Sequence, residues 1–197
     1  MAQPPLEPGI LYHIYNRGNN GETIFIEERN YDYFLQLYDK YISPIVDTFS
    51  YCLLPNHFHF LIRVKTDLPG FENLEGLKPP YRYFSNFFNA YTKAFNKTYN
   101  RNDSLFEKNF KRKPVTNDAY FTKLVAYIHQ NPQRHGLIDD FRDWPYSSYT
   151  VLASQKPTRL ARAEILDWFT DRDGFLTFHQ NVADFKNIPS LVEGDGN

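Results

Sequence analysis

Residues 54–62 read Leu-Pro-Asn-His-Phe-His-Phe-Leu-Ile, and this short stretch decides the fold prediction and the site prediction together. Side chains alternate between the two faces of a β-strand, so His57, His59 and Leu61 are expected to share one face. The opposite face is then apolar and turned towards a core, because it carries Phe58, Phe60, Ile62 and Val64. The stretch therefore predicts a strand with one hydrophobic face and one face that presents two imidazoles.

Two imidazoles side by side on a rigid strand supply two of the ligands that a divalent metal ion needs. The alternative interpretation is an amphipathic strand whose exposed face happens to carry two histidines. The chain contains only six histidines, so a metal site at this strand needs a third ligand from elsewhere in the sequence.

The elements around this stretch predict an α+β fold. Strands are expected at residues 9–16, 46–54 and 57–65, and only Pro55 and Asn56 separate the last two, which indicates a hairpin. Helical spacing of apolar residues predicts helices at 30–41, 81–97 and about 117–131, with Pro132 and Gly136 ending the last one. Short strands are expected around residues 105–106 and at Phe110. This order favours a ferredoxin-like antiparallel sheet with helices packed on one face, the last helix lying near the C-terminal end of the core.

Composition bounds the size and the class of the protein. A chain of 197 residues suits one domain of roughly 150 residues with appendages. We expect a loose N-terminus at 1–8, a domain at 9–150, and a C-terminal appendage with an acidic tail at 151–197. The net charge of -1 does not favour a polyanionic partner for the molecule as a whole. Binding to nucleic acid must then come from a local basic patch.

Cysteine content and hydropathy exclude several classes. The single cysteine, Cys52, excludes an internal disulfide and a cysteine-based zinc site. No stretch approaches 18 apolar residues, and the first residues lack the basic and apolar parts of a signal peptide. No membrane partner is therefore expected, and the cytoplasm is the expected location.

The helix predicted at 117–131 carries the candidate third ligand. Lys123, Tyr127 and Asn131 follow one another at intervals of four and so share a face. If that face lies over the two histidines, the Asn131 oxygen becomes a third ligand and the Tyr127 phenol lies beside the metal, with Gln130 as the competing ligand. Two imidazoles and an amide oxygen suit Mg²⁺ or Mn²⁺ and leave positions open for a phosphate. The alternatives are a packing tyrosine with its hydroxyl at the surface and an asparagine that caps the helix before Pro132.

A basic and aromatic segment lies between residues 97 and 113. Phosphate contacts combined with base stacking are typical of proteins that bind single-stranded nucleic acid. The alternative is a solvated hairpin. Arg17, next to a Gly-Asn turn, is a further candidate contact. The segment supplies the cations Lys97, Arg101, Lys108, Lys111, Arg112 and Lys113 and the rings Tyr99, Phe106 and Phe110.

These motifs together resemble a known family. The His-Phe-His strand resembles the HUH motif of single-strand tyrosine transposases. Residues 127–137 (Tyr-Ile-His-Gln-Asn-Pro-Gln-Arg-His-Gly-Leu) resemble their catalytic-tyrosine helix, most closely in the REP-associated tyrosine transposase branch. Residues 12–18 and 143–149 are also similar to that branch. The resemblance spans about residues 9–150, with the four motifs in the same order.

The resemblance implies a function for each candidate residue. It implies that His57 and His59 are metal ligands, that Asn131 is the third ligand and that Tyr127 is the nucleophile. It further implies cleavage and joining of single-stranded or hairpin DNA through a 5′-phosphotyrosine. We expect Mg²⁺ or Mn²⁺ as cofactor, a nucleoid-associated location in the cytoplasm, and a second copy of the chain as a candidate partner.

Two other functional classes compete with this one. A domesticated, non-catalytic nucleic-acid-binding module of the same fold is the main alternative, although the intact set of histidines, tyrosine and asparagine favours the enzyme. A metal hydrolase of small molecules would need a site rich in carboxylates. No carboxylate accompanies the histidine strand or the Tyr127 face, so we rank this class last.

Overall fold

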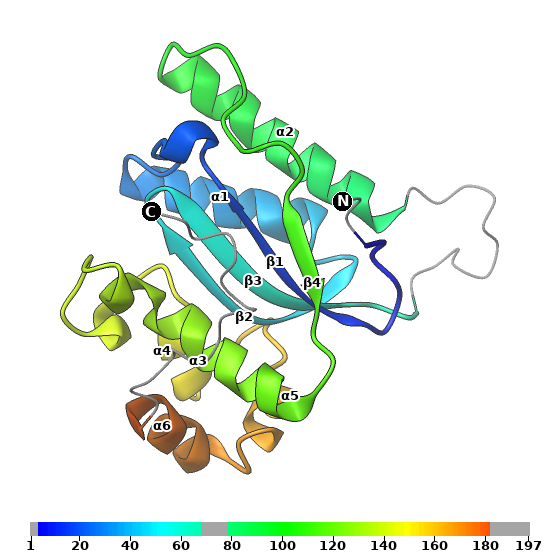
Figure 1. Ribbon diagram of the computed structural model, residues 1–197, viewed down its shortest axis with the longest axis vertical. Coiled ribbons are helices and arrows are strands. Elements are labelled where there is room, and N and C mark those ends of the chain that lie inside the picture. Colours follow the sequence, from blue (N-terminus) through cyan, green and yellow to red (C-terminus); the bar gives the residue numbers. More distant parts are fainter. Residues whose placement is uncertain (1–3, 68–78, 182–197) are drawn as a thin grey trace.

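The centre of the computed structural model, which describes residues 4–67 and 79–181, is a four-stranded antiparallel sheet in the order β2-β3-β1-β4. Its strands are β1 (Leu11–Arg17), β2 (Val46–Leu54), β3 (His57–Val64) and β4 (Lys111–Pro114). The predicted hairpin of β2 and β3 is present, and β1 lies between β3 and β4 (Figure 1). The α+β class with an antiparallel sheet is confirmed.

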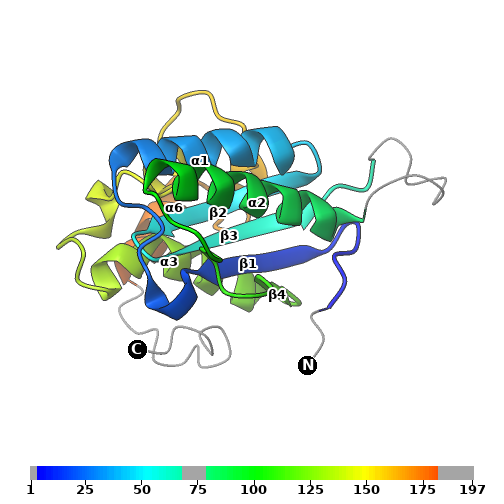
Figure 2. The ribbon, with the colours of Figure 1, turned by 90° about the horizontal axis from the view of Figure 1, so that it is seen from above.

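Helices cover both faces of this sheet, whereas the sequence led us to expect them on one face. Helices α1 (Glu28–Tyr41) and α2 (Pro80–Thr98) lie next to each other on one side, as Figures 1 and 2 show. The other side carries α3 (Asp118–Arg134) and, beyond it, α4 (Tyr149–Ala153), α5 (Arg162–Asp167) and α6 (Arg172–Asn181). Two 3-10 turns, η1 (Asn19–Gly21) and η2 (Phe141–Asp143), complete the described elements.

The reason for the second layer lies in β2, which is apolar on both faces. Leu53 joins the core under α1 and α2, while Cys52 and Leu54 belong to a second core under α3. A strand buried on both sides shows a continuous apolar run in place of clean alternation. The β3 face with Phe58 and Phe60 packs under α1 and α2, as predicted, so the histidine face of β3 is turned towards α3.

Helix α3 passes through Pro132 and ends two residues later, which corrects the predicted end near Asn131. Its end is a Schellman motif, because the Gly136 amide donates to the Gln133 carbonyl and the Leu137 amide donates to the Pro132 carbonyl. Gly136 has a φ of 67°, a conformation that suits glycine. Asn131 is therefore an internal helix residue, and its interpretation as a helix cap is wrong.

Both ends of the described chain pack on the core more closely than expected. Near the start, Leu6 is buried, and the Tyr12 hydroxyl donates to the Pro5 carbonyl, so residues 4–8 are held against the sheet. In the segment expected to be an appendage, Ile165 and Phe175 belong to the second core. Residues 1–3 and the tail at 182–197 lie outside the described residues. Among the described residues, no helix is long and apolar enough to cross a lipid bilayer.

Candidate active site

The two histidines of β3 lie on one face of the sheet, as the strand pattern predicts. The centroids of the His57 and His59 rings are 5.2 Å apart, and the ring planes are nearly perpendicular. His59 is only 1% exposed, because α3 covers this face. The alternative of an amphipathic strand with exposed histidines is therefore wrong.

His57 is held in the tautomer that can bind a metal. Its Nδ1 lies 2.7 Å from the Asn56 Oδ1, and an amide oxygen only accepts, so Nδ1 carries the proton and Nε2 the lone pair. Nε2 is buried and has no hydrogen-bond partner within the described part of the chain. Burial, followed by the neighbouring His59, His135 and Arg17, lowers the pKa of His57 to about 2. The ring is neutral at physiological pH, as ligation requires.

His59 is bonded to a third imidazole that the sequence interpretation missed. The Nδ1 of His59 lies 2.9 Å from the Nε2 of His13 on the neighbouring strand β1. His13 is fully buried, and burial lowers its pKa well below the ordinary value. The spacing His13-Ile14-Tyr15 places His13 and Tyr15 on one strand face, but only the register between β1 and β3 turns that face towards His59.

Helix α3 presents Tyr127 and Asn131 to the histidine pair. The Tyr127 ring centroid lies 5.6 Å from that of His59, and the His135 centroid lies 5.0 Å from that of His57. Residues 127, 131 and 135 follow one another at intervals of four and share one helix face. Asn131, between the two that touch histidines, must therefore face the gap between His57 and His59.

The Asn131 side chain has the properties of an unused ligand. Its residue is fully buried, yet neither its Oδ1 nor its Nδ2 has a hydrogen-bond partner among the described residues. Buried polar atoms are nearly always hydrogen-bonded, so an amide without partners suggests a role towards a bound group. With the lone pair of His57 aimed into the same region, these residues fit a divalent ion.

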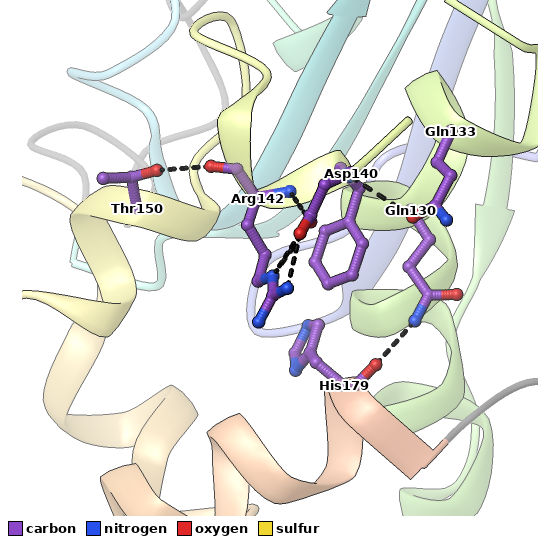
Figure 3. A network of polar contacts seen from close by, with 7 residues as sticks. Gln130, Gln133, Asp140, Arg142, Thr150 and His179 are labelled. Atoms are coloured by element: carbon purple, nitrogen blue, oxygen red, sulfur yellow. Dashed lines mark hydrogen bonds and ion pairs between the residues drawn. The ribbon is translucent and has the colours of Figure 1, made fainter. Parts of the chain in front are cut away.

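Gln130, the competing ligand, is engaged elsewhere. Its side-chain amide donates to the main-chain oxygen of His179 on α6 at 2.8 Å (Figure 3). One residue along a helix turns the side chain by about 100°, which directs Gln130 towards α6 while Asn131 faces the sheet. The geometry favours Asn131 as third ligand.

The described residues offer no further histidine or carboxylate ligand set. Across residues 4–67 and 79–181, no group of three or more His, Cys, Asp or Glu is arranged to hold a metal ion. Among these residues, the Asn131 amide oxygen is the candidate third ligand beside His57 and His59. This donor set suits Mg²⁺ or Mn²⁺ with a phosphate in the open positions.

Tyr127 is buried beside the histidines, only 1% exposed, rather than at the surface. The guanidinium carbon of Arg134 lies 5.1 Å from the Tyr127 ring centroid, a cation–π contact. Arg134 was not predicted as a site residue. Its spacing of seven from Tyr127, two helical turns, is the signal that could have indicated it.

The structure divides the predicted DNA-binding segment into several environments. Phe106 and Phe110 pack against Phe88 in the core under α2, and both also line the groove beside α2, so their stacking on bases stays a prediction. The Tyr99 hydroxyl is bonded to Glu27 and Asn30, which leaves its ring packed on Phe95.

Two of the cations predicted to bind DNA form ion pairs with carboxylates of the protein. Arg101 forms an ion pair with Glu22, and the Nε of Arg17 lies 3.5 Å from a Glu107 oxygen. These contacts stabilise the turn after β1. Lys97, at the end of α2, and Lys108 are exposed. They remain candidate phosphate contacts, and the solvated-hairpin alternative applies to them.

Strand β4 distributes the remaining cations over both faces of the sheet. Lys111 pairs with Tyr15 and Lys113 with His13, so these lysines share the histidine face of the sheet. Arg112 pairs with Ile14 and faces the α2 side. There a groove of about 1030 Å³ opens between α2 and residues 104–112, and its lining includes Asn16, Asn89, Lys108, Asn109 and Arg112 as well as the rings of Phe88, Phe106 and Phe110.

The chain that carries this sheet, histidine pair and facing tyrosine helix is similar to REP-associated tyrosine transposases in sequence and in fold. A REP-associated tyrosine transposase of Haemophilus influenzae is 24% identical over 139 residues, which are 64% of this chain and 77% of that protein. The solved structure of a REP-associated tyrosine transposase bound to a REP hairpin matches 80% of this chain and 87% of its own, with a TM-score of 0.56 and 16% identity. No protein-family model matches the chain. The resemblance indicated by the motifs is thus confirmed in sequence and in fold.

Proposed function

We propose that this protein cleaves and rejoins single-stranded or hairpin DNA through a covalent phosphotyrosine on Tyr127, with a divalent metal ion held by His57, His59 and Asn131. The observation that carries the proposal is that candidate metal ligands and a tyrosine from β3 and α3 face one another. A neutral His57 with a buried lone pair, an Asn131 amide without partners and the Tyr127 ring beside His59 meet between β3 and α3.

The residues divide the reaction between them. When bound, Mg²⁺ or Mn²⁺ supplies neutralisation of the charge that develops on the scissile phosphate. The Tyr127 hydroxyl loses its proton to solvent as its oxygen attacks phosphorus and forms the new P–O bond. The P–O bond to the 3′-oxygen breaks, and that oxygen takes up a proton and leaves as a 3′-hydroxyl, so no net proton is gained or lost. The ester energy is retained, so a 3′-hydroxyl of a second strand reverses the step and joins the strands without ATP.

The cations and the groove support DNA as the substrate. Lys111 and Lys113 flank the histidine face, where phosphates of the cleaved strand would pass. The groove on the other side of β4 offers amide groups to unpaired bases. The REP hairpin bound in the solved relative supports a hairpin as the ligand of this chain as well.

A covalent adduct tests the proposal directly. The protein is incubated with Mn²⁺ and hairpins that share one stem and carry randomised single-stranded flanks, labelled at the 5′ or the 3′ end. A 5′-phosphotyrosine keeps the 3′-labelled fragment on the protein in a denaturing gel and releases the 5′-labelled fragment. Hairpin binding without any adduct would favour the non-catalytic module, and no binding at all would refute both functions.

A further inference from the structure

The site contains two outer-shell hydrogen bonds of different chemistry, one behind each histidine of the pair. The Nδ1 of His57 is bonded to the Asn56 Oδ1. This oxygen can only accept a hydrogen bond, so His57 must carry its proton on Nδ1. Behind His59 stands the His13 Nε2, which can accept or donate. The hydrogen bond to Asn56 therefore fixes His57 in its metal-binding tautomer. The tautomer of His59, in contrast, depends on which ring nitrogen of His13 carries the proton.

His13 is fixed tightly enough to act on its neighbour. It is fully buried in the middle of β1, and its ring is stacked on Tyr15 with centroids 4.7 Å apart. Its register partner across the sheet is Leu61, and that of Tyr15 is His59, so the bond from His13 to His59 runs diagonally between the strands. No other hydrogen-bond partner of the His13 ring occurs among the described residues.

With one proton on each ring, two arrangements of protons are open to this buried pair. If His59 Nδ1–H donates to His13 Nε2, the His59 Nε2 bears a lone pair, and the proton of His13 is on its Nδ1. If His13 Nε2–H donates instead, the proton of His59 is on Nε2, which then cannot ligate a metal. The metal site of the proposed function requires the first arrangement.

We propose that His13 is a positioning residue that accepts a hydrogen bond from His59 Nδ1 and thereby holds His59 in its metal-binding tautomer. The inference rests on the proposed function, since it concerns the same metal site. Outer-shell partners of metal-bound histidines orient the ring and fix its tautomer, and their loss typically lowers metal affinity 10- to 100-fold. His13 is an imidazole in the place where a carboxylate or a carbonyl commonly stands.

Metal titration tests the inference without any DNA. Mn²⁺ is titrated by calorimetry into wild-type protein and variants whose folding has been checked by circular dichroism. His13→Phe, which keeps a ring but removes the acceptor, is expected to bind Mn²⁺ 10- to 100-fold more weakly. His13→Gln restores an acceptor and should recover most of the affinity.

Tyr12→Phe is the matched control. It lies next to His13 on β1 and loses hydrogen bonds to Pro5 and Glu7, but it belongs to the core on the opposite face of the sheet. Its affinity for Mn²⁺ should equal that of the wild type. Unchanged binding by His13→Phe, with binding lost in His57→Ala, would overturn the inference alone. Absence of saturable Mn²⁺ binding in the wild type would overturn the proposed metal site and the inference with it.

Imidazole nitrogen spectra give a second test that needs no substitution at His13. In protein labelled with ¹⁵N-histidine, six histidines are few enough to assign by long-range proton–nitrogen correlation. With saturating Mg²⁺, His59 should show a protonated Nδ1 and His13 an unprotonated Nε2. A His59 ring protonated at Nε2 under these conditions would refute the inference even if His13→Phe does not fold.

Discussion

Tyr127 is the residue on which the proposed chemistry depends most directly. Tyr127→Phe keeps the buried ring beside His59 and removes only the attacking oxygen. We therefore expect covalent adduct formation and cleavage to vanish, while hairpin affinity and the thermal midpoint stay close to wild type. The measurement is the labelled-hairpin gel assay in Mn²⁺, run beside a filter-binding titration.

Tyr120 provides the control for this substitution. It lies on the same helix seven residues earlier, and burial raises its pKa to about 12, which makes its phenol harder to ionise. Tyr120→Phe should form the adduct as the wild type does. An adduct that survives in Tyr127→Phe and disappears in Tyr120→Phe would move the nucleophile to Tyr120.

Substitutions of Asn131 and of Gln130 are expected to have different effects on Mn²⁺ affinity. Asn131→Ala removes the amide that faces the histidine gap and should weaken Mn²⁺ binding by at least tenfold, because a direct ligand of the metal is removed. Gln130→Ala removes a bond to the His179 main chain and should lower the stability by about 1 kcal/mol with little change in Mn²⁺ affinity. Calorimetric titration of both variants decides between them, and a reversed order would make Gln130 the ligand.

At the scale of elements, strand β4 carries three cations that are candidate phosphate contacts. Replacing Lys111, Arg112 and Lys113 by alanine should weaken binding of all single-stranded sequences alike. The slope of log affinity against log salt should become shallower by up to about 2, because each phosphate that is no longer neutralised by a cation reduces it by roughly 0.7. Titrations at several salt concentrations measure this slope. The exposed Lys156 is far along the chain from this strand, and an unchanged slope in Lys156→Ala is the control.

The groove beside α2 is the basis for predicting whether the protein prefers single-stranded or duplex DNA. Its asparagine side chains can bond to the Watson–Crick edges of bases only where these are unpaired, and the near-neutral molecule offers weak long-range attraction to duplex. We expect single strands, or a hairpin with a single-stranded flank, to compete better than a fully paired duplex of the same sequence. Equal competition by the duplex would contradict this expectation.

Phe106 belongs to the core under α2 and also lines the groove beside it. Its ring packs against Phe58, Phe88 and Tyr91, so Phe106→Ala should lower the free energy of unfolding by about 3–5 kcal/mol. Urea unfolding measures this decrease. If Phe106→Leu, which largely refills the volume, restores stability and retains DNA affinity, the ring has a packing role only.

At the scale of the whole molecule, a chain of hydrogen bonds joins the sheet to the last helix. The Tyr51 amide donates to Ser148 Oγ, which lies 3.2 Å from the Tyr51 carbonyl and 2.8 Å from His129 Nε2 and can donate its one proton to either. The Nδ1 of His129 then donates to His179 Nε2, and the Nδ1 of His179 donates to the Phe175 carbonyl. The Nδ1 of His179 carries a proton because it faces a carbonyl, so a neutral His179 accepts from His129 at Nε2, and a second proton on His179 breaks that bond.

This network predicts a decrease of stability in mild acid. Burial lowers the pKa of His179 to about 4, below the ordinary value of 6.5, so the unfolded chain takes up the proton first. Stability is fully present above pH 6.5 and falls as the pH drops towards 4, by up to roughly 3 kcal/mol from His179 alone. Urea unfolding between pH 7.5 and pH 4.5 measures the trend.

His179→Phe isolates this contribution from those of the other buried histidines. His13, His57 and His129 shift in the same direction, so the whole protein also becomes less stable in this range. The variant should be less stable at pH 7.5 but should lose less stability on acidification than the wild type. Identical pH slopes in the two proteins would show that His179 does not titrate in this way.

Local spacing determined the parts of this protein that depend on periodicity. The period of two placed His57 and His59 on one strand face, and the period of 3.6 placed Tyr127 and Asn131 on one helix face. The two-residue link at Pro55 and Asn56 determined the hairpin. These features were predictable because each depends only on residues close together in the chain.

Only the tertiary structure decided which faces meet. The partnership of His13 with His59, the contact of Arg134 with Tyr127 and the burial of Phe106 and Phe110 depend on strand register and on how helices pack. The same holds for the choice between Asn131 and Gln130, since a rotation of about 100° around the helix separates an amide aimed at the histidines from one bound to α6. Packing also decides which helices bury the two faces of the sheet. An apolar strand sequence predicts that the strand is covered, but it does not predict which helix covers it.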